Sequence, residues 1–197
     1  MKGTLSLKTA PAIDPITLTE IKAHCRIDIS DDDTYLGTLI KAGVSYIEAL
    51  TGIRLVSQTW YFYMDDFPTG SELILPIGPV TAISSVKYTS ESTGAVATLS
   101  TDYYSNDLVS LPARIFLKPD YSWPDVSEDV VNGVVVEFVA GYAVSESVAT
   151  TPADLKAAVK LLVSHWYEHR MAAGEAELKN TPMAVESILA NYRMWQR

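Results

Sequence analysis

SDDDTYLGTLIKAGVSYIEALTG, residues 30–52, decides the fold together with VSQTWYFYM, residues 56–64. Apolar residues recur every three or four positions in the first stretch, which predicts an amphipathic helix, with Ser30 or Asp31 as its cap and Gly52 at its end. In the second stretch they occupy alternate positions, which predicts a half-buried strand. The chain therefore passes from helix to sheet near residue 53. The helical stripe comprises Leu36, Leu39, Ile40, Gly43, Ile47 and Leu50.

The alternating pattern continues for about ninety residues after this point. In the first strand Trp60, Phe62 and Met64 are expected to face the core, with Tyr61 and Tyr63 on the opposite side. Turn signals separate the later strands, so we expect an antiparallel sheet or a small barrel. These strands are ELILPI (72–77), ISSVKY (83–88), AVATLS (95–100), RIFLKP (114–119) and GVVVEFVAGY (133–142).

Helical patterns stand on both sides of this block. ITLTEIKAHCRID, residues 16–28, predicts a short helix capped by Thr17 or Thr19, and residues 151–170 predict a long helix capped by Thr151. A short closing helix is expected in TPMAVESILANYRMW, residues 181–195, and a loop between the two. The predicted fold class is α+β: a helical bundle of two N-terminal and two C-terminal helices (1–52 and 151–197) with an inserted β domain (53–150).

Composition excludes several classes of protein. The 197 residues are 48% hydrophobic, enough for a real core, but no run approaches the roughly 20 apolar residues of a membrane span, and no signal peptide is recognisable. Cys25 is the one cysteine, so neither an internal disulfide nor a cysteine-based zinc site is possible. We therefore expect a protein that stays in the cytoplasm where it is made and has no membrane partner.

The net charge of −9 is concentrated in the middle of the chain. Residues 53–150 contain twelve Asp and Glu against four Lys and Arg, whereas residues 151–197 contain five against six. An acidic surface repels phosphate, so non-specific nucleic-acid binding through the middle segment is not expected.

The pattern H-x-x-E-H at His165–His169 is the inverted zinc-peptidase signature. Two histidines four apart on a helix can share a metal, with Glu168 as general base, but a catalytic zinc needs a third ligand. The candidates for this third ligand are Glu175, Glu177 and His24, and none of them stands in a recognisable zinc-binding sequence. We therefore favour histidines that pack beside Trp166, and predict no catalytic residue, metal or cofactor; the zinc peptidase is kept as an alternative.

Two other ligand-binding interpretations are weaker. A calcium loop counted from Asp31 would place Leu36 and Ala42 where an EF-hand needs glycine and glutamate, so a helix cap is favoured. The eleven tyrosines and four tryptophans leave open a β-domain module that binds sugar or peptide, although most stand at core-facing or loop positions.

The order of these elements resembles the head-tail connector, or adaptor, proteins of tailed bacteriophages, prophages and gene transfer agents. The resemblance rests on the two N-terminal helices, on a β insert containing LPIGPVTAISSVKY (75–88), on a strand ending in AGY (140–142) and on the long helix after it. It runs from about residue 16 to residue 193. Family positions at the ends of the last two helices match Trp166, Tyr167, Arg170, Pro182, Val185, Leu189, Tyr192 and Arg193, and Trp195 follows them.

The resemblance implies a non-enzymatic ring, commonly a dodecamer in the virion, between the portal and a stopper or tail-completion protein. DNA would pass through its channel without specific binding, and the protein would be located in the neck of the virion. The matched residues, with Trp195, are then the candidate partner-binding residues on the segment that docks onto the portal. Residues 171–181 are expected to become ordered only when a partner is bound.

Overall fold

The computed structural model describes residues 3–169 and 183–194, which form two compact units. The β unit consists of residues 3–11 and 57–141, and the helical unit consists of residues 12–56, 142–169 and 183–194. In these ranges no helix is both long enough and apolar enough to cross a membrane.

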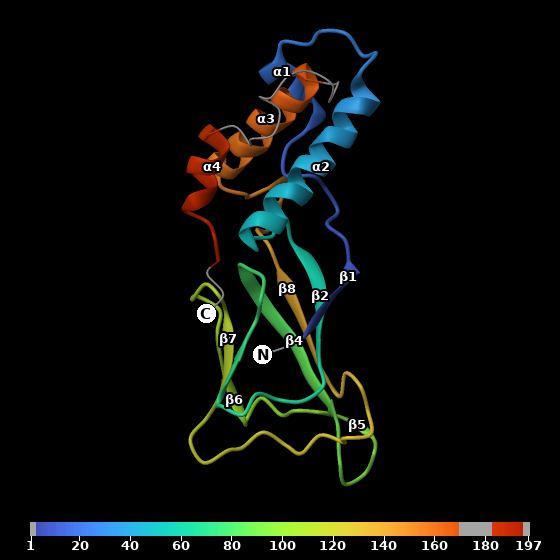
Figure 1. Cartoon of the computed structure of the whole chain (residues 1–197), viewed down its shortest axis with the longest axis vertical. Coiled ribbons are helices and arrows are strands. Elements are labelled where there is room, and N and C mark those ends of the chain that lie inside the picture. Colours follow the sequence, from blue (N-terminus) through green and yellow to red (C-terminus); the bar gives the residue numbers. More distant parts are fainter. Residues whose placement is uncertain (1–2, 170–182, 195–197) are drawn as a thin grey trace. The chain divides into compact units, whose positions relative to one another are not determined.

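The helical unit is built around α3, which packs against the other three helices (Figure 1). Its buried core includes Ile21, Leu36, Ile47, Leu155 and Leu162. A small hairpin precedes α3. The elements are α1 (Leu18–Cys25), α2 (Asp33–Thr51), β9 (Val144–Ser145), β10 (Val148–Ala149), α3 (Ala153–Glu168) and α4 (Met183–Ala190).

The start of α1 is a complete capping box with Thr17 as the N-cap, which is one of the two caps predicted from the sequence. The Glu20 N–H donates to the Thr17 hydroxyl at 3.1 Å, and the Thr17 N–H donates to the Glu20 carboxylate at 2.8 Å. Two of the backbone donors at the helix start are thereby satisfied. Lys160 of α3 donates to the same carboxylate at 3.2 Å, so the cap also ties α1 to α3.

Thr17→Ala should therefore lower the free energy of unfolding by about 1 kcal/mol, the usual effect of losing a side-chain cap. Chemical denaturation measures this difference. Thr19→Ala is the matched control, since Thr19 is an exposed residue inside α1. Equal effects of the two substitutions would contradict the capping role of Thr17.

The other two predicted caps are wrong. The N-cap of α2 is Asp32, without a side-chain hydrogen bond, and not Ser30 or Asp31. The N-cap of α3 is Pro152, because the hydroxyl of the buried Thr151 donates to the carbonyl of Leu55 instead. Gly52 is confirmed at the end of α2: its φ of 75° lies in the left-handed region that glycine tolerates best.

The β unit contains two antiparallel sheets, one of five strands and one of three. The larger sheet has the order β1-β2-β8-β4-β5, and β2, β8 and β4 lie side by side at its centre (Figure 1). The smaller sheet has the order β3-β7-β6. The strands are β1 (Thr4–Thr9), β2 (Gln58–Met64), β3 (Glu72–Ile74), β4 (Val80–Thr89), β5 (Val96–Thr98), β6 (Tyr104–Asp107), β7 (Arg114–Leu117) and β8 (Val134–Ala140).

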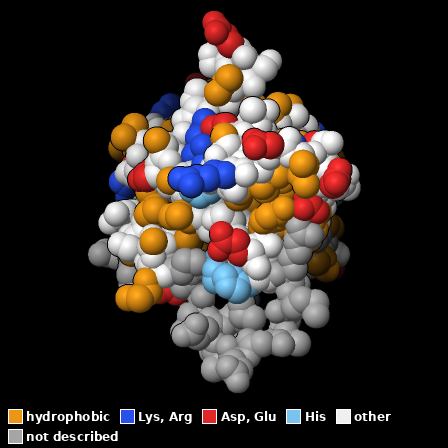
Figure 2. Space-filling view, turned by 90° about the horizontal axis from the view of Figure 1, so that it is seen from above, with side chains coloured by type: hydrophobic (Ala, Val, Ile, Leu, Met, Phe, Trp, Pro, Cys, Tyr) orange, Lys and Arg blue, Asp and Glu red, His pale blue; other side chains and the backbone are white. Residues whose placement is uncertain are grey.

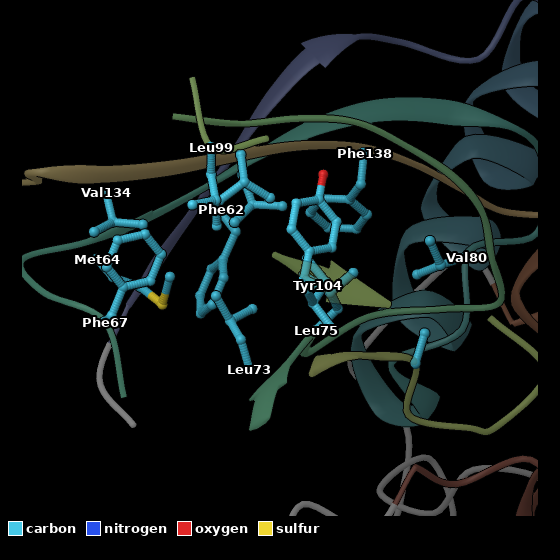
Figure 3. Packing of buried hydrophobic residues seen from close by; sticks show 14 of the residues in the cluster. Phe62, Met64, Phe67, Leu73, Leu75, Val80, Leu99, Tyr104, Val134 and Phe138 are labelled. Carbon is cyan, nitrogen blue, oxygen red and sulfur yellow. The ribbon is translucent and has the colours of Figure 1, made fainter. Parts of the chain in front are cut away.

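The core of the β unit lies between these sheets. Phe62 and Phe138 of the larger sheet point toward the side that carries Leu73 and Tyr104 of the smaller sheet (Figure 3). The predicted alternation is confirmed in β2 at Phe62 and Met64, which are buried while Tyr61 and Tyr63 lie on the opposite face, although Trp60 is only half-buried. It is also confirmed in β8, where Val134, Val136 and Phe138 are buried. The described strands form an open pair of sheets, since β1 and β5 are edges of the larger one, so the alternative of a closed barrel is wrong.

Strand β1 was not predicted from the sequence. Residues 4–9 pair with β2 and belong to the β unit, although the sequence placed residues 1–52 with the helices. Five of the six residues of β1 are exposed, so no buried face imposes an alternating pattern on the sequence TLSLKT. A fragment of residues 53–150 therefore lacks one edge strand of the sheet that it would need as an independent module.

Candidate functional site

The aromatic pair at the end of α3 is held against α2. The ring of Trp166 meets the ring of Tyr46 edge to face at 5.9 Å between centroids. The Tyr167 hydroxyl donates to the carboxylate of Asp32 at 2.6 Å, and its ring lies 6.3 Å from that of Tyr35. Both residues are half-buried, so a large part of each side chain serves packing inside the helical unit.

The histidines of the H-x-x-E-H pattern stand at the very end of α3. The helix ends at Glu168, and His169 is the residue that follows it, with its N–H donating to the His165 carbonyl at 3.1 Å. Nδ1 of the His169 ring lies 2.9 Å from the same carbonyl oxygen, and the two rings are 4.7 Å apart. His165 is half-buried, but His169 and Glu168 are both exposed, so the packing of histidines expected beside Trp166 does not extend to a buried His169.

The described residues do not add support for a metal site at the end of α3. Within residues 3–169 and 183–194 no group of three or more His, Cys, Asp and Glu side chains is arranged to hold a metal ion. Burial, and after it the negative charge of Glu168, raises the pKa of the Cys25 thiol. This favours the unreactive thiol form. Two of the proposed third ligands, Glu175 and Glu177, lie outside the described residues.

Helix α4 docks through an apolar stripe. Val185 and Leu189 are fully buried in the core of the helical unit, with Ile188 packed beside them. The opposite side of the short helix is exposed, and Met183 at its start is 85% exposed. The outer side of α4 could have been predicted from the sequence, because it consists of the helix positions that lie outside the apolar stripe.

The residues after α4 are anchored at two points of the helical unit. The Tyr192 hydroxyl donates to Asp154 in the first turn of α3 at 2.6 Å, and the Met194 N–H donates to the Thr51 carbonyl at 2.9 Å. The side chain of Met194 also lies against Gly52, with its sulfur 3.3 Å from where a Cβ would stand. Arg193 between these anchors is exposed. The course of the chain after α4 is therefore fixed as far as residue 194.

The candidate residues thus divide by role in the isolated chain. Contacts within the helical unit are made by Trp166, Tyr167, Val185, Leu189 and Tyr192, whereas Arg193 is exposed. On the face of the molecule in Figure 2, hydrophobic side chains form separate patches between acidic and basic ones. The other three candidates, Arg170, Pro182 and Trp195, lie outside the described residues.

The Tyr192 anchor predicts a pH dependence. Burial, and then the hydrogen bond to Asp154, raise the pKa of Tyr192 to about 12. The native state holds this proton more tightly than the unfolded state, so the contribution to stability is fully present below pH 10, the ordinary pKa of tyrosine, and is lost between pH 10 and 12. The free energy of unfolding should fall more steeply over this interval in the wild type than in Tyr192→Phe. Parallel pH profiles of the two proteins would contradict the anchor.

A family model for head completion proteins matches residues 15–195. The chain belongs to this family. No curated protein matches the sequence. The family match covers the helical unit and nearly all of the β unit, so the resemblance expected from the order of elements is confirmed.

Solved structures share the fold of this head completion protein along nearly its whole length. A chain in the virion of a native gene transfer agent particle has a TM-score of 0.78 at 20% identity, covering 98% of this chain and 96% of that chain. A chain in the neck of a native particle computed with C12 symmetry has a TM-score of 0.77 at 21% identity, with 98% and 97% covered. A chain in the neck of an empty particle computed with C6 symmetry has a TM-score of 0.76 at 20% identity, with the same coverage as the C12 neck.

Proposed function

We propose that this head completion protein is a structural component of the virion neck, a connector that forms a ring between the portal and a stopper or tail-completion protein. The observation that carries the proposal is the family match over residues 15–195. It is supported by the shared fold with neck chains of gene transfer agent particles over 98% of the chain. The comparisons give no support to a zinc peptidase or to a separate ligand-binding module.

In this proposal the four helices act as one bundle and form the body of the ring. Each copy then offers two different faces to its neighbours, a heterologous contact that closes after a fixed number of copies. Twelve copies are the expected number, because one of the similar neck chains belongs to a particle computed with C12 symmetry.

The portal contact is assigned to the outer side of α4 and the residues after it. Met183 and Arg193 are exposed there, while Val185 and Leu189 fix the helix from below. A docking surface carried on a helix that is already folded binds without a large ordering cost. The buried candidates are therefore positioning residues for the exposed ones, and Arg193 is an exposed charged group on this surface.

The acidic β unit suits a conduit for DNA. Its residues 3–11 and 57–141 contain eleven Asp and Glu against four Lys and Arg. Such a surface makes few phosphate contacts that would have to be broken as DNA moves past. DNA is therefore a passing cargo of the ring and not a bound ligand.

Deletion of the gene from the genome that encodes it tests this role. Electron microscopy should then show heads without attached tails, and supplying the chain in trans should restore complete particles. A supplied Arg193→Glu variant should restore fewer complete particles than an Asn191→Asp control, which also adds a carboxylate to an exposed position beside α4. Complete, tailed particles from the deletion strain would contradict the proposal.

A further inference from the structure

Two edges of the larger sheet are left open in the isolated chain. On one side β1 is the outermost strand (Figure 1), and five of its six residues are exposed. On the other side β5 covers only the end of β4, where it pairs with Lys87–Thr89. Residues 81–85 of β4 pair with β8 alone among the described strands, and Thr81, Ala82 and Ser84 are exposed. The backbone groups that point outward at these two edges therefore lack a neighbouring strand.

Length selects these two edges for each other. β1 has six residues, and the free part of β4 runs over residues 81–85. The other open edges of the two described sheets belong to shorter strands: β3 and β5 have three residues each, and β6 has four. Natural edges are protected from a further strand by charges, proline or bulges, and of these residues 81–85 have only register shifts. Among these edges, the free part of β4 is the best match for β1.

Strand direction favours the same pairing. Along the sheet β1, β2, β8 and β4 are each antiparallel to the next, so β1 and β4 run in opposite directions. Neighbouring copies in a ring of about twelve differ by a small rotation and keep this relation. β1 of one copy is therefore antiparallel to β4 of the next. It is parallel to β5, and parallel pairs are slightly less stable per residue.

Apolar side chains stand at both edges in one row of the inner face of the sheet. The row consists of Leu7, Trp60, Phe138 and Ile83, each directly opposite the next in the strand pairing. Phe138 is fully buried, whereas Leu7 at one end is 45% exposed and Ile83 at the other end is only partly buried. Addition of β1 to β4 of a second copy brings these two ends together on the same face and removes apolar surface from water.

We propose that β1 of one copy adds to the free edge of β4, residues 81–85, of the next copy, so that the larger sheets of neighbouring subunits join into one. The contact is heterologous, because the two edges are different surfaces, and repeated contacts of this kind close a ring. Backbone hydrogen bonds hold the two strands together, and the apolar row determines which face of β1 points inward. The inference rests on the proposed function and identifies a surface that joins one subunit to the next.

Disulfide trapping between two differently substituted copies tests the contact. In a Cys25→Ala background one copy carries Ser6→Cys and the other Ala82→Cys or Ser85→Cys, all on the outer face of the sheet. The copies are mixed and oxidised with and without the cognate portal protein. Because each copy has one cysteine, any crosslinked dimer joins two chains. The dimer should be at least about tenfold more abundant than with Val96→Cys, an outer-face position of β5 that is 70% exposed.

Two results of this experiment overturn the proposal. One is an equal yield of dimer with Val96→Cys, which would show that β1 does not distinguish the edge of β4 from that of β5. The other is an equal yield from Ser6→Cys alone. Two β1 strands that pair with each other make a closed twofold dimer, which cannot continue into a ring.

Leu7→Lys gives an independent test, because a charge on the inner side of an edge strand prevents the addition of a further strand. Assembly into rings should weaken by at least about tenfold. The thermal unfolding midpoint should stay close to that of the wild type, since Leu7 is 45% exposed in the single chain. Ser6→Lys is the matched control: it places the same charge on the outer face of β1, which strand addition leaves in water, and should assemble normally.

Normal rings from Leu7→Lys overturn the proposal. Normal rings with lost portal binding also overturn it, because they would assign β1 to the portal contact. If the wild-type chain forms no ring at all, with or without the portal protein, the proposed function itself fails.

Discussion

Leu189→Ala should lower the free energy of unfolding of the helical unit by about 2–5 kcal/mol, the range for deleting a buried leucine side chain. Leu189 is 1% exposed and packs in the core that α4 shares with α3. An eight-residue helix is not stable alone in water, so α4 depends on this contact. We expect the substitution to detach α4, to raise hydrogen exchange over residues 183–194 and to abolish binding to the portal.

Ser187→Ala is the matched control, since Ser187 lies on the exposed side of the same helix. It should change stability by less than about 0.5 kcal/mol and leave portal binding intact. Portal binding that survives Leu189→Ala, with exchange over residues 183–194 raised, would show that docked α4 is not the contact surface.

Phe138→Ala should destabilise the β unit by about 3–5 kcal/mol. Phe138 is fully buried at the centre of the larger sheet, where β8 pairs with both β2 and β4, and its ring faces the smaller sheet. The remaining cavity cannot close without moving strands that are paired on both sides. Hydrogen exchange over residues 134–140 measures the loss in this unit separately from the helical unit.

Val139→Ala is the control that tests which face of β8 is buried. Val139 is the next residue of β8 and points to the opposite side of the sheet, where it is only partly buried. Its replacement should cost well under half as much as that of Phe138. Equal losses at the two positions would mean that the buried face has been assigned incorrectly.

The elements with a strong period were predictable from sequence. In α2, β2 and β8 one face is largely buried, so the apolar spacing and the structure coincide at most positions. The exceptions are Leu50 of α2, which is 39% exposed, and Trp60 of β2, which is half-buried. Strand β1 has no such face, and β6 is only four residues long, so neither produces a readable pattern. The caps of α2 and α3 were misplaced for a different reason: capping residues compete for several partners, and Thr151 bonds to Leu55, distant in sequence.

The candidate site was predictable in part. The resemblance indicated the ends of α3 and α4, but it could not separate residues that hold those helices from residues that face outward. That distinction comes from packing, as the burial of Leu189 and the exposure of Met183 show. The five residues of the H-x-x-E-H pattern do not show where the second histidine lies, because the end of α3 at Glu168 depends on the chain beyond them.

The central claim is that this chain forms a ring in the neck, and a mass measurement tests it most directly. Light scattering coupled to size exclusion should give one chain of 21.6 kDa or a closed ring when the protein is alone. With the cognate portal protein it should give a complex whose added mass equals about twelve chains, the number expected from the similar neck chain with C12 symmetry. A chain that stays monomeric at all concentrations and adds no mass to the portal would contradict the account.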